Sequence, residues 1–568
     1  MLVLLARFGL DSTAHFDEYQ YLMAAALWPD LALYRDFHYS QTPYFPVALS
    51  WWMEWFGGES PNWAAKVFNV IWAQIFVVVL WLLCRWIARS ALIATLITFA
   101  VTASPVLSLV LAIVRNDMMA VALAAGGVGL VLLASDVDKP WRARSFVFFG
   151  GLLLALSVGT KQSMAFLALA ALAFTLFVAG SGPFAKRALT LGLPLALGGF
   201  LGGLPMLALA LADWPNFLFA TTEFHRTAHA AWTLRGGRPY LVEFEWTLYR
   251  LVKYLIAGSS IILAICLGMV FCLELPRLGR STLLSRQTRE GQAMLFVLLG
   301  LAFGVPVMLL AKPMHVHYPA PLLLLLAVGC AAAAYRAWQS AVSARSRLAY
   351  RATAAALFGF ALWFALFNPI GFGHPLHHGA YFHLFRWIGP PEQTWAATRA
   401  ARIRADFREV LGPPDRNVCI ATLMPFYPVE AGYNTFRELA GSPFFYRTNE
   451  IYEPSRLREL NGIAPAEVES WLARNEVQAV LVGFGANLDG AFRAYAEDRG
   501  FQAFEIDLRD GHDHGDKEDE PLATLLVAPS FLETSGKRHR TGEPALALGQ
   551  CGTPAAPRKD MQNEGENE

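Results

Sequence analysis

Long apolar runs separated by short charged loops fill the chain as far as about residue 368. Most of these runs are close to the roughly 18 to 20 residues that a helix needs to cross a bilayer. They predict spanning helices near 66–84, 91–114, 117–134, 145–160, 163–180, 188–212, 253–273, 292–311, 318–335 and 352–368. The pattern therefore predicts an all-α polytopic membrane domain.

The first ten residues, MLVLLARFGL, are also apolar but shorter than the other runs. At 1.5 Å per residue they form about 15 Å of helix, half of what a crossing requires. We expect either a stub helix or a start of the chain that has been assigned too late. A signal peptide is not expected, because the stretch is too short and has no small-residue cleavage site. With this stub, about 11 transmembrane helices are expected.

Basic residues gather in every second loop between the apolar runs. These loops lie near 85–89, 139–144, 186–187, 277–289 and 336–351. Short basic loops stay in the cytoplasm, so the alternate segments are expected on the outer side of the cytoplasmic (inner) membrane. The outer segments are 11–62, 115–117, 160–162, 213–250, 312–317 and everything after 369.

The chain changes character after residue 369, where shorter alternating patterns replace the long apolar runs. The patterns predict strands at 417–423, 478–484, 501–508 and 524–529, and helices at 465–474 and 489–498. Strands mixed with amphipathic helices indicate a small α/β domain, here over 369–529 and extracytoplasmic. Residues 530–568 are rich in charge, Gly and Pro, which predicts a disordered tail.

Composition supports the membrane interpretation and argues against a nucleic-acid-binding protein and a disulfide-rich protein. Charged residues make up 16% of the chain, below the roughly 25% of an ordinary soluble domain. The formal net charge of +1 gives no basic surplus, so nucleic acid is not an expected partner. Of six cysteines, only Cys419 and Cys551 lie away from apolar runs. We therefore expect no disulfide framework and assume no pairing.

Two adjacent acids, Asp17 and Glu18, open a predicted helix in the first outer segment. Neighbours on a helix point about 100° apart, so only one of them can face a given reacting atom. One interpretation is structural, since acids at a helix N-terminus interact favourably with its dipole. The other is a carboxylate held at the membrane surface, because Trp51, Trp52 and Trp55 follow and suit the headgroup layer.

Arg115 and Asp117 lie between two predicted spans that are joined by a very short turn. A tight turn requires polar residues for local reasons alone. The predicted topology nevertheless brings Asp117 to the same face as Asp17. Two carboxylates there could bind a cation, or act as a general base and an orienting group.

Cationic side chains end other spans on the outer side. Lys161 and Gln162 form one such turn, and the lysine either snorkels to the headgroups or neutralises the phosphate of a lipid-linked substrate. Lys312, His315 and His317 precede a later span and could extend this cationic patch. A phosphate leaving group needs stabilisation of this kind.

No cofactor is firmly implied, and a divalent metal is left open. Glu223, His225 and His229 have a spacing that could hold a metal from one helix face, although the spacing is common and further ligands are not identified. Two histidine-rich stretches, 374–383 and 509–520, are interpreted as an interfacial linker and a solvated turn.

The order of these polar motifs resembles that of the GT-C membrane glycosyltransferases. The matching stretches are DEYQYLMAAALW, YRDFHYSQTPYFP, RNDMMAVALA, TKQSMAFLALA and HVHYPAPLLLLL. They cover most of residues 11–330 and are most similar to the branch containing protein O-mannosyltransferases, lipid A aminoarabinose transferases and lipopolysaccharide-core galacturonosyltransferases. The later EAGYNTFRELAGSPFF is similar to the soluble domain of some bacterial members.

The resemblance implies an inverting transfer of a sugar from a polyprenyl-phosphate donor. The acceptor would be a cell-envelope glycolipid, polysaccharide or protein on the outer face of the membrane. By position, Asp17 would be the general base, supported by Glu18. Asp117 would approach the donor or a metal, and Lys161 would lie near the lipid phosphate.

Two positions depart from the pattern of the relatives. Asn116 stands where many of them have proline. His317, which precedes Tyr318, stands where many have arginine, so a permanent positive charge is replaced by a titratable group.

Two other function classes compete with a transferase. A transporter or flippase of lipid-linked sugars usually carries ionisable residues near the bilayer midplane, whereas the interiors of the predicted spans carry almost none. A noncatalytic scaffold would leave Asp17, Asp117 and Lys161 on one face by chance. The sequence thus predicts a GT-C glycosyltransferase domain over residues 1–368, with the sugar donor, the acceptor and membrane lipids as partners.

Overall fold

The computed structural model separates into two compact units, one made largely of residues 1–400 and the other of residues 401–509 and 513–568. It describes residues 2–11, 16–28, 30–56, 60–180, 182–256, 259–261, 263–265, 268, 285–340, 348, 359, 396–415, 418–508, 523–538 and 551. The second unit begins later than the predicted residue 369, and residues 369–395 lie outside the described residues.

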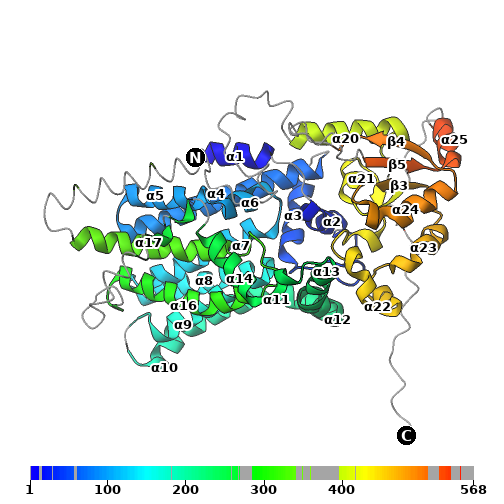
Figure 1. Cartoon of the computed structure of the whole chain (residues 1–568). Coiled ribbons are helices and arrows are strands. Elements are labelled where there is room, and N and C mark those ends of the chain that lie inside the picture. Colours follow the sequence, from blue (N-terminus) through cyan, green and yellow to red (C-terminus); the bar gives the residue numbers. More distant parts are fainter. Residues whose placement is uncertain are drawn as a thin grey trace, which may run out of the picture. The chain divides into compact units, whose positions relative to one another are not determined.

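The described part of the first unit is helical (Figure 1). Its α-helices are α1 (Leu2–Asp11), α2 (Phe16–Leu27), α3 (Tyr44–Phe56), α4 (Pro61–Ala88), α5 (Ala91–Thr102), α6 (Pro105–Ala112), α7 (Asn116–Ala134), α8 (Pro140–Thr160), α9 (Ala165–Phe177), α10 (Phe184–Arg187), α11 (Leu193–Ala212), α12 (Trp214–Leu218), α13 (His229–Arg235), α14 (Phe244–Leu255), α16 (Arg289–Leu309) and α17 (Ala320–Ser340). Shorter 3-10 or π-helical pieces are η1 (Gln162–Met164), η2 (Ala188–Gly192), η3 (Phe219–Ala228) and η4 (Pro239–Val242).

Six helices among the described residues are long and apolar enough to cross a membrane, or seven if α5 and α6 form one bent span. The six are Pro61–Ala88, Asn116–Ala134, Pro140–Thr160, Phe184–Ala212, Arg289–Leu309 and Ala320–Gln339. The predicted span at 163–180 is a shorter apolar helix, Gln162–Phe177. About half of the predicted span at 253–273, and nearly all of that at 352–368, lies outside the described residues. The all-α polytopic architecture is confirmed.

The stretch predicted as a span at 91–114 is not one continuous helix, because α5 and α6 meet at an angle of 67°. Ser104 caps α6, its hydroxyl accepting a hydrogen bond from the backbone N–H of Leu107, and Pro105 is the first residue of the helix. Proline disfavours helical backbone at the residue before it, and a serine cap followed by proline is a strong helix start. The apolar run therefore breaks here although its hydropathy does not change.

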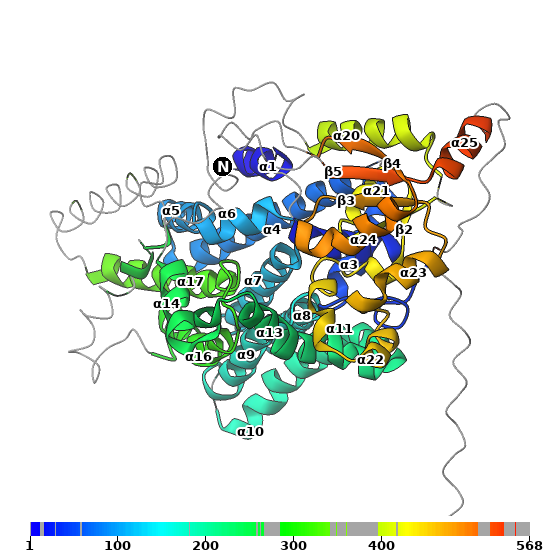
Figure 2. The same cartoon turned by 45° about the vertical axis from the view of Figure 1, so that its right-hand side comes forward.

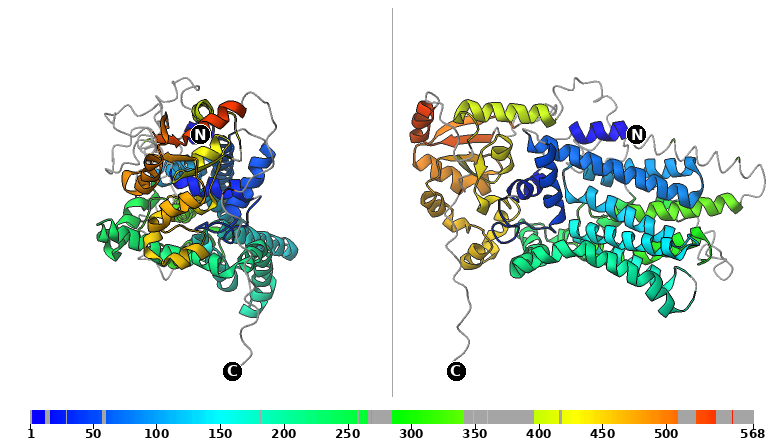
Figure 3. Two further views of the ribbon diagram at one scale, coloured as in Figure 1. Left: turned by 90° about the vertical axis from the view of Figure 1, so that its right-hand side faces the viewer. Right: turned by 180° about the vertical axis from the view of Figure 1, so that it is seen from behind.

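The long helices α4, α7, α8 and α11 run alongside one another (Figure 3), and α16 and α17 are paired (Figure 2). One continuous apolar core joins residues of α4, α5, α7, α8, α9, α16 and α17. The pair α8 and α11 approaches closely through glycines. A Cβ on Gly198 would lie 1.9 Å from the Phe148 carbonyl oxygen, and one on Gly151 would lie 2.1 Å from that of Leu195.

Replacing Gly198 with leucine should therefore force α8 and α11 apart. Overpacking of this kind costs about 1–3 kcal/mol, so the protein should lose its monodisperse detergent-solubilised form at a lower temperature. Gly203→Leu is the matched control, because a Cβ there would meet no atom within 4 Å. Equal melting temperatures for the two variants, measured by size exclusion after heating, would contradict this packing.

The second unit contains a five-stranded sheet in the order β2-β1-β3-β5-β4. The strands are β1 (Cys419–Thr422), β2 (Asn434–Thr435), β3 (Ala479–Val482), β4 (Gln502–Ile506) and β5 (Ala523–Val527). Strand β1 is parallel to β2 and β3, whereas β5 is antiparallel to β3 and β4. The four predicted strands are confirmed, and the two-residue β2 was not predicted.

Helices cover both sides of this sheet (Figures 1 and 3). On one side lies α20 (Ala396–Leu411), and on the other lies α24 (Ala486–Asp498), which packs with α23 (Val468–Arg474). The last two are the helices predicted at 489–498 and 465–474. The remaining α-helices of the unit are α21 (Phe426–Glu430), α22 (Pro454–Glu459) and α25 (Pro529–Arg538).

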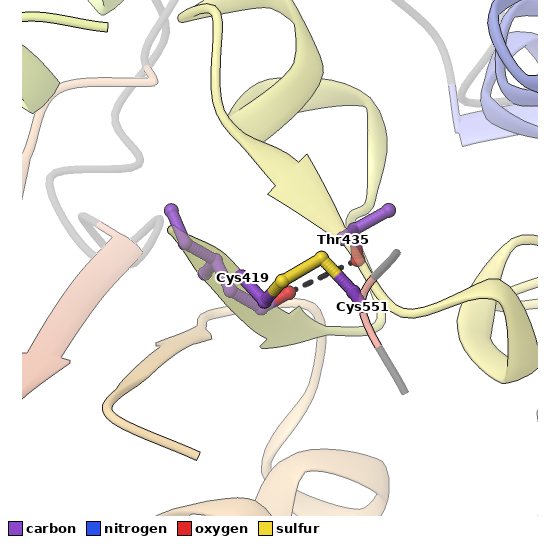
Figure 4. Close-up of a disulfide and its surroundings, with 4 residues drawn as sticks. Cys419, Thr435 and Cys551 are labelled. Carbon is purple, nitrogen blue, oxygen red and sulfur yellow. Dashed lines mark hydrogen bonds between the residues drawn. A yellow bond between two sulfur atoms is a disulfide. The ribbon is translucent and has the colours of Figure 1, made fainter. Parts of the chain in front are cut away.

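The prediction that residues 530–568 are disordered is corrected at two places. Helix α25 covers the beginning of this stretch, and Cys551 forms a disulfide bond with Cys419 on β1 (Figure 4). No pairing was expected from the sequence, because four of the six cysteines lie inside or beside apolar runs and give no disulfide framework. The two bonded cysteines are 132 residues apart. Cys84 and Cys330 are buried and are not part of a disulfide bond.

Candidate active site

Four segments far apart in the sequence bring their polar residues together in the first unit. They are the N-terminal turn of α2, the break between α6 and α7, the turn between α8 and η1, and the residues that precede α17. The last three each connect two apolar helices, so their polar residues lie at helix ends. This is the arrangement that the alternation of outer segments predicted.

Arg115 is the centre of the cluster. Its guanidinium donates from Nη1 to Asp17 Oδ2 and from Nε to Asp117 Oδ2, the latter at 3.2 Å. Its third nitrogen, Nη2, lies 2.7 Å from His317 Nε2. Arginine can only donate, so His317 Nε2 is the acceptor and the neutral ring carries its proton on Nδ1. The guanidinium is thus held by three acceptors from three different segments.

Asp117 is the buried carboxylate of the cluster and has two cationic partners. Besides Arg115, it accepts a hydrogen bond from Lys161 Nζ, which lies 5.5 Å from the centre of the Tyr318 ring. Burial lowers the pKa of Lys161, and the adjacent Asp117 carboxylate opposes that shift. Burial raises the pKa of Tyr318 to about 12, so its hydroxyl stays protonated. A buried carboxylate is tolerated when it is paired and hydrogen-bonded in this way.

The two adjacent acids of α2 point in different directions, as their helical spacing predicted. The Asp17 side chain is 19% exposed and faces Arg115. The Glu18 side chain is fully buried and bonds Lys66 Nζ of α4 at 2.6 Å. Asp17 is therefore the carboxylate that a molecule from outside can reach, whereas Glu18 belongs to the protein interior.

Asn116 connects three elements around the cluster. Its Nδ2 donates to the backbone oxygen of Thr160 at 3.0 Å, and its Oδ1 accepts from the Tyr21 hydroxyl at 3.3 Å. Burial raises the pKa of Tyr21, which keeps that hydroxyl a donor. A proline at this position would have no side-chain amide, so this tie between α7, α8 and α2 depends on the asparagine.

A row of histidines extends from the cluster to α13. The rings of His317 and His315 are stacked, with centroids 5.6 Å apart and an interplanar angle of 15°. His315 Nε2 in turn lies 3.1 Å from His229 Nε2. Two of the residues proposed for phosphate binding, His315 and His317, and one of the residues proposed for metal binding, His229, therefore form one group.

The predicted metal trio does not form a site. Glu223 is exposed, His225 Nε2 contacts the backbone oxygen of Ser40, and His229 contacts His315 instead. The two histidines are thus engaged by different partners although they are only four residues apart. Among the described residues, no three His, Cys, Asp or Glu side chains gather as metal ligands. The histidine-rich stretches 374–383 and 509–520 lie outside the described residues.

Two other predicted residues stay apart from the cluster. Gln162 begins η1, and Lys312 is exposed ahead of the histidine row. Within the part of the chain that the structure describes, no hydrogen bond or ion pair joins either side chain to Arg115 or its partners. Both were predicted from proximity in sequence, which does not fix the direction of a side chain.

Lys66 is a buried charged residue that was not predicted from the sequence. It lies in the second turn of α4 and is 1% exposed. The predicted span begins at residue 66, so the prediction treats Lys66 as its boundary and not as a charge inside the helix. An ionisable residue within an apolar run is a functional or structural site by default, because burying an unpaired charge is costly. That rule applied to α4 would have singled out Lys66.

No model of a known protein family matches the sequence, and no curated protein matches it either. Solved structures do match the fold. ArnT from Cupriavidus metallidurans, in a crystal structure bound to undecaprenyl phosphate, aligns with a TM-score of 0.55 and 12% identity over 93% of this chain and 97% of that one. Its apo form gives the same values. The chain therefore shares the fold of this ArnT.

A second match is the oligosaccharyltransferase of Archaeoglobus fulgidus in its apo form. It has a TM-score of 0.47 and 12% identity, over 95% of this chain and 77% of that chain. At these identities the likeness concerns the fold, so the chemistry must be argued from the cluster around Arg115.

Proposed function

We propose that the chain is an integral membrane glycosyltransferase that moves a sugar from a polyprenyl-phosphate donor to a cell-envelope acceptor, inverting the anomeric carbon. The observation that supports this most is the cluster itself. A partly exposed carboxylate, Asp17, lies against a buried group of two cations and a second carboxylate at the ends of apolar helices. ArnT, which shares the fold, was crystallised with undecaprenyl phosphate.

The reaction needs little from the protein beyond alignment and charge. The bond between the anomeric carbon and the phosphate oxygen breaks, its electron pair leaves on the phosphate, and the acceptor oxygen bonds the carbon from the opposite side. Asp17 takes the proton of the acceptor hydroxyl. Arg115 and Lys161 stabilise the charge that grows on the departing phosphate.

The charges of the cluster suggest how donor binding prepares the base. Two carboxylates, Asp17 and Asp117, face two cations, Arg115 and Lys161, so these four side chains sum to zero. A donor phosphate brings an extra negative charge and competes for the cations. As Arg115 shifts toward the phosphate, its hold on Asp17 weakens and a carboxylate oxygen is released to accept a proton.

The sidedness of the site is part of the proposal. Short basic loops predict that the cluster faces away from the cytoplasm. The disulfide between Cys419 and Cys551 supports the same side for the second unit, because such bonds persist in oxidising compartments. We therefore place the active site and the α/β unit on the outer face of the cytoplasmic membrane.

The proposal is tested by giving the purified protein labelled polyprenyl-phosphate sugars together with candidate acceptors. Release of polyprenyl phosphate, dependent on an acceptor and accompanied by a product of opposite anomeric configuration, is the expected result. If labelled lipid instead crosses the bilayer of a proteoliposome with its sugar bond intact, the chain is a flippase. Retention of configuration would contradict a single displacement at the anomeric carbon with Asp17 as the base.

A further inference from the structure

The break between α6 and α7, at residues 113–115, is a short non-helical stretch in a buried environment. Ile113 and Val114 are 5% and 0% exposed. Backbone groups that leave a helix in such surroundings must find partners, because water is not available to them. Arg115 directly follows this break as the N-cap residue of α7.

Helix α4 supplies two of the partners from one of its faces. Lys66 Nζ donates to the backbone oxygen of Ala112 at 2.8 Å, and Asn69 Nδ2 donates to that of Leu111 at 2.9 Å. The two residues are three apart, so they lie on the same side of the helix. Together they bind carbonyl groups at the end of α6 that lack partners within that helix.

Helix α2 supplies the partner for the next amide. Glu18 Oε1 accepts from the backbone N–H of Val114 at 2.7 Å and from Lys66 Nζ at 2.6 Å. The Lys66 side chain is 1% exposed and that of Glu18 is fully buried. One lysine thus connects the end of α6 with the carboxylate that holds the residue before Arg115.

We propose that Lys66 is a positioning residue for the transferase site, an inference that rests on the proposed function. Lys66 keeps the Glu18 carboxylate charged and in place, and Glu18 fixes the backbone at Val114. Asp17 then meets the side chain of the next residue, Arg115. The two adjacent acids of α2 therefore hold two successive residues. Glu18 binds the backbone N–H of Val114, and Asp17 binds the guanidinium of Arg115.

The charge of Lys66 is what the position requires. Replacing it with methionine keeps a flexible side chain of similar length but leaves Glu18 buried without its cation, which is strongly unfavourable. The carboxylate must then move or take up a proton, and the amide of Val114 loses a fixed acceptor. Changing Glu18 to glutamine at the same time removes the unpaired charge while keeping an oxygen that can accept from Val114.

The test measures backbone protection and turnover in the full-length protein. Hydrogen exchange of peptides covering residues 110–118 should be roughly tenfold faster in Lys66→Met than in the wild type. In Glu18→Gln/Lys66→Met, exchange should return most of the way to the wild-type rate. Lys186→Met is the matched control, because Lys186 is exposed on α10, and it should exchange as the wild type does.

Kinetics of the same variants separate positioning from general destabilisation. Lys66→Met should lower kcat roughly tenfold or more while the KM for the donor stays within about threefold, and the double variant should regain part of kcat. The role of Lys66 would be overturned if residues 110–118 exchanged hydrogen at the wild-type rate in Lys66→Met. It would also be overturned if the double variant exchanged as fast, and turned over as slowly, as the single variant. A wild-type protein without transferase activity would refute the proposed function instead, and the exchange measurement would still decide whether Lys66 holds the break.

Discussion

Asp17→Asn should reduce turnover at least about 10²-fold, while the protein keeps its fold and its affinity for the donor. Asparagine is nearly isosteric, and its side-chain oxygen can still accept a hydrogen bond from Arg115. What it loses is the ability to take a proton from the acceptor hydroxyl. The measurement is the initial rate of polyprenyl-phosphate release at saturating donor and acceptor, together with the KM for each.

Asp30→Asn is the control for this substitution. Asp30 follows the same helix, α2, and is exposed, so its loss should leave the rate unchanged. If Asp17→Asn turns over within a few fold of the wild type, Asp17 is not the base. Asp117 would not replace it readily, because its side chain is fully buried and engaged by Arg115 and Lys161.

Arg115→Met should be the most damaging single change, affecting both stability and rate. It removes the ion pair with Asp17 and leaves the buried carboxylate Asp117 paired with Lys161. Removing one partner of a buried ion pair typically costs about 3–5 kcal/mol, and losing a cation that stabilises a leaving group typically costs 10² to 10³ in rate. Thermal denaturation in detergent and the transfer assay measure the two effects separately.

Arg115→Lys distinguishes charge from geometry. A lysine keeps the positive charge but has a single nitrogen, which cannot reach Asp17, Asp117 and His317 as the guanidinium does. Stability should recover in large part, whereas the rate should stay at least about tenfold low. Arg35→Met is the control, since Arg35 is 56% exposed in its pair with Asp36. A fully active Arg115→Lys would indicate that only the charge matters.

Hydropathy and loop charge were enough to predict the helical membrane domain and the meeting of Asp17, Arg115, Asp117, Lys161 and His317. Arg115, Asp117, Lys161 and His317 lie at the ends of apolar runs, and Asp17 opens a helix in the first outer segment. Alternation of sides along the chain is expected to bring these segments together. The bend between α5 and α6 could also have been predicted, because a serine followed by proline, here Ser104 and Pro105, is a typical N-cap and first residue of a helix. An unbroken apolar run concealed it.

The remaining contacts depend on how helices rotate against one another, which no local pattern encodes. Lys66 and Glu18 are 48 residues apart, and their pairing requires particular faces of α4 and α2 to meet. The predicted metal trio failed for the same reason. Residues close in sequence were assumed to act together, whereas His229 instead meets His315, 86 residues away.

The disulfide bond between Cys419 on β1 and Cys551 can form only late in the synthesis of the chain. Cys419 leaves the ribosome 132 residues before its partner, so through that interval the nascent sheet carries an unpaired thiol. The disulfide bond can therefore form only after all five strands have been synthesised. A chain that stalls before residue 551 would keep a reactive sulfur, by which quality-control factors can distinguish unfinished molecules from mature ones.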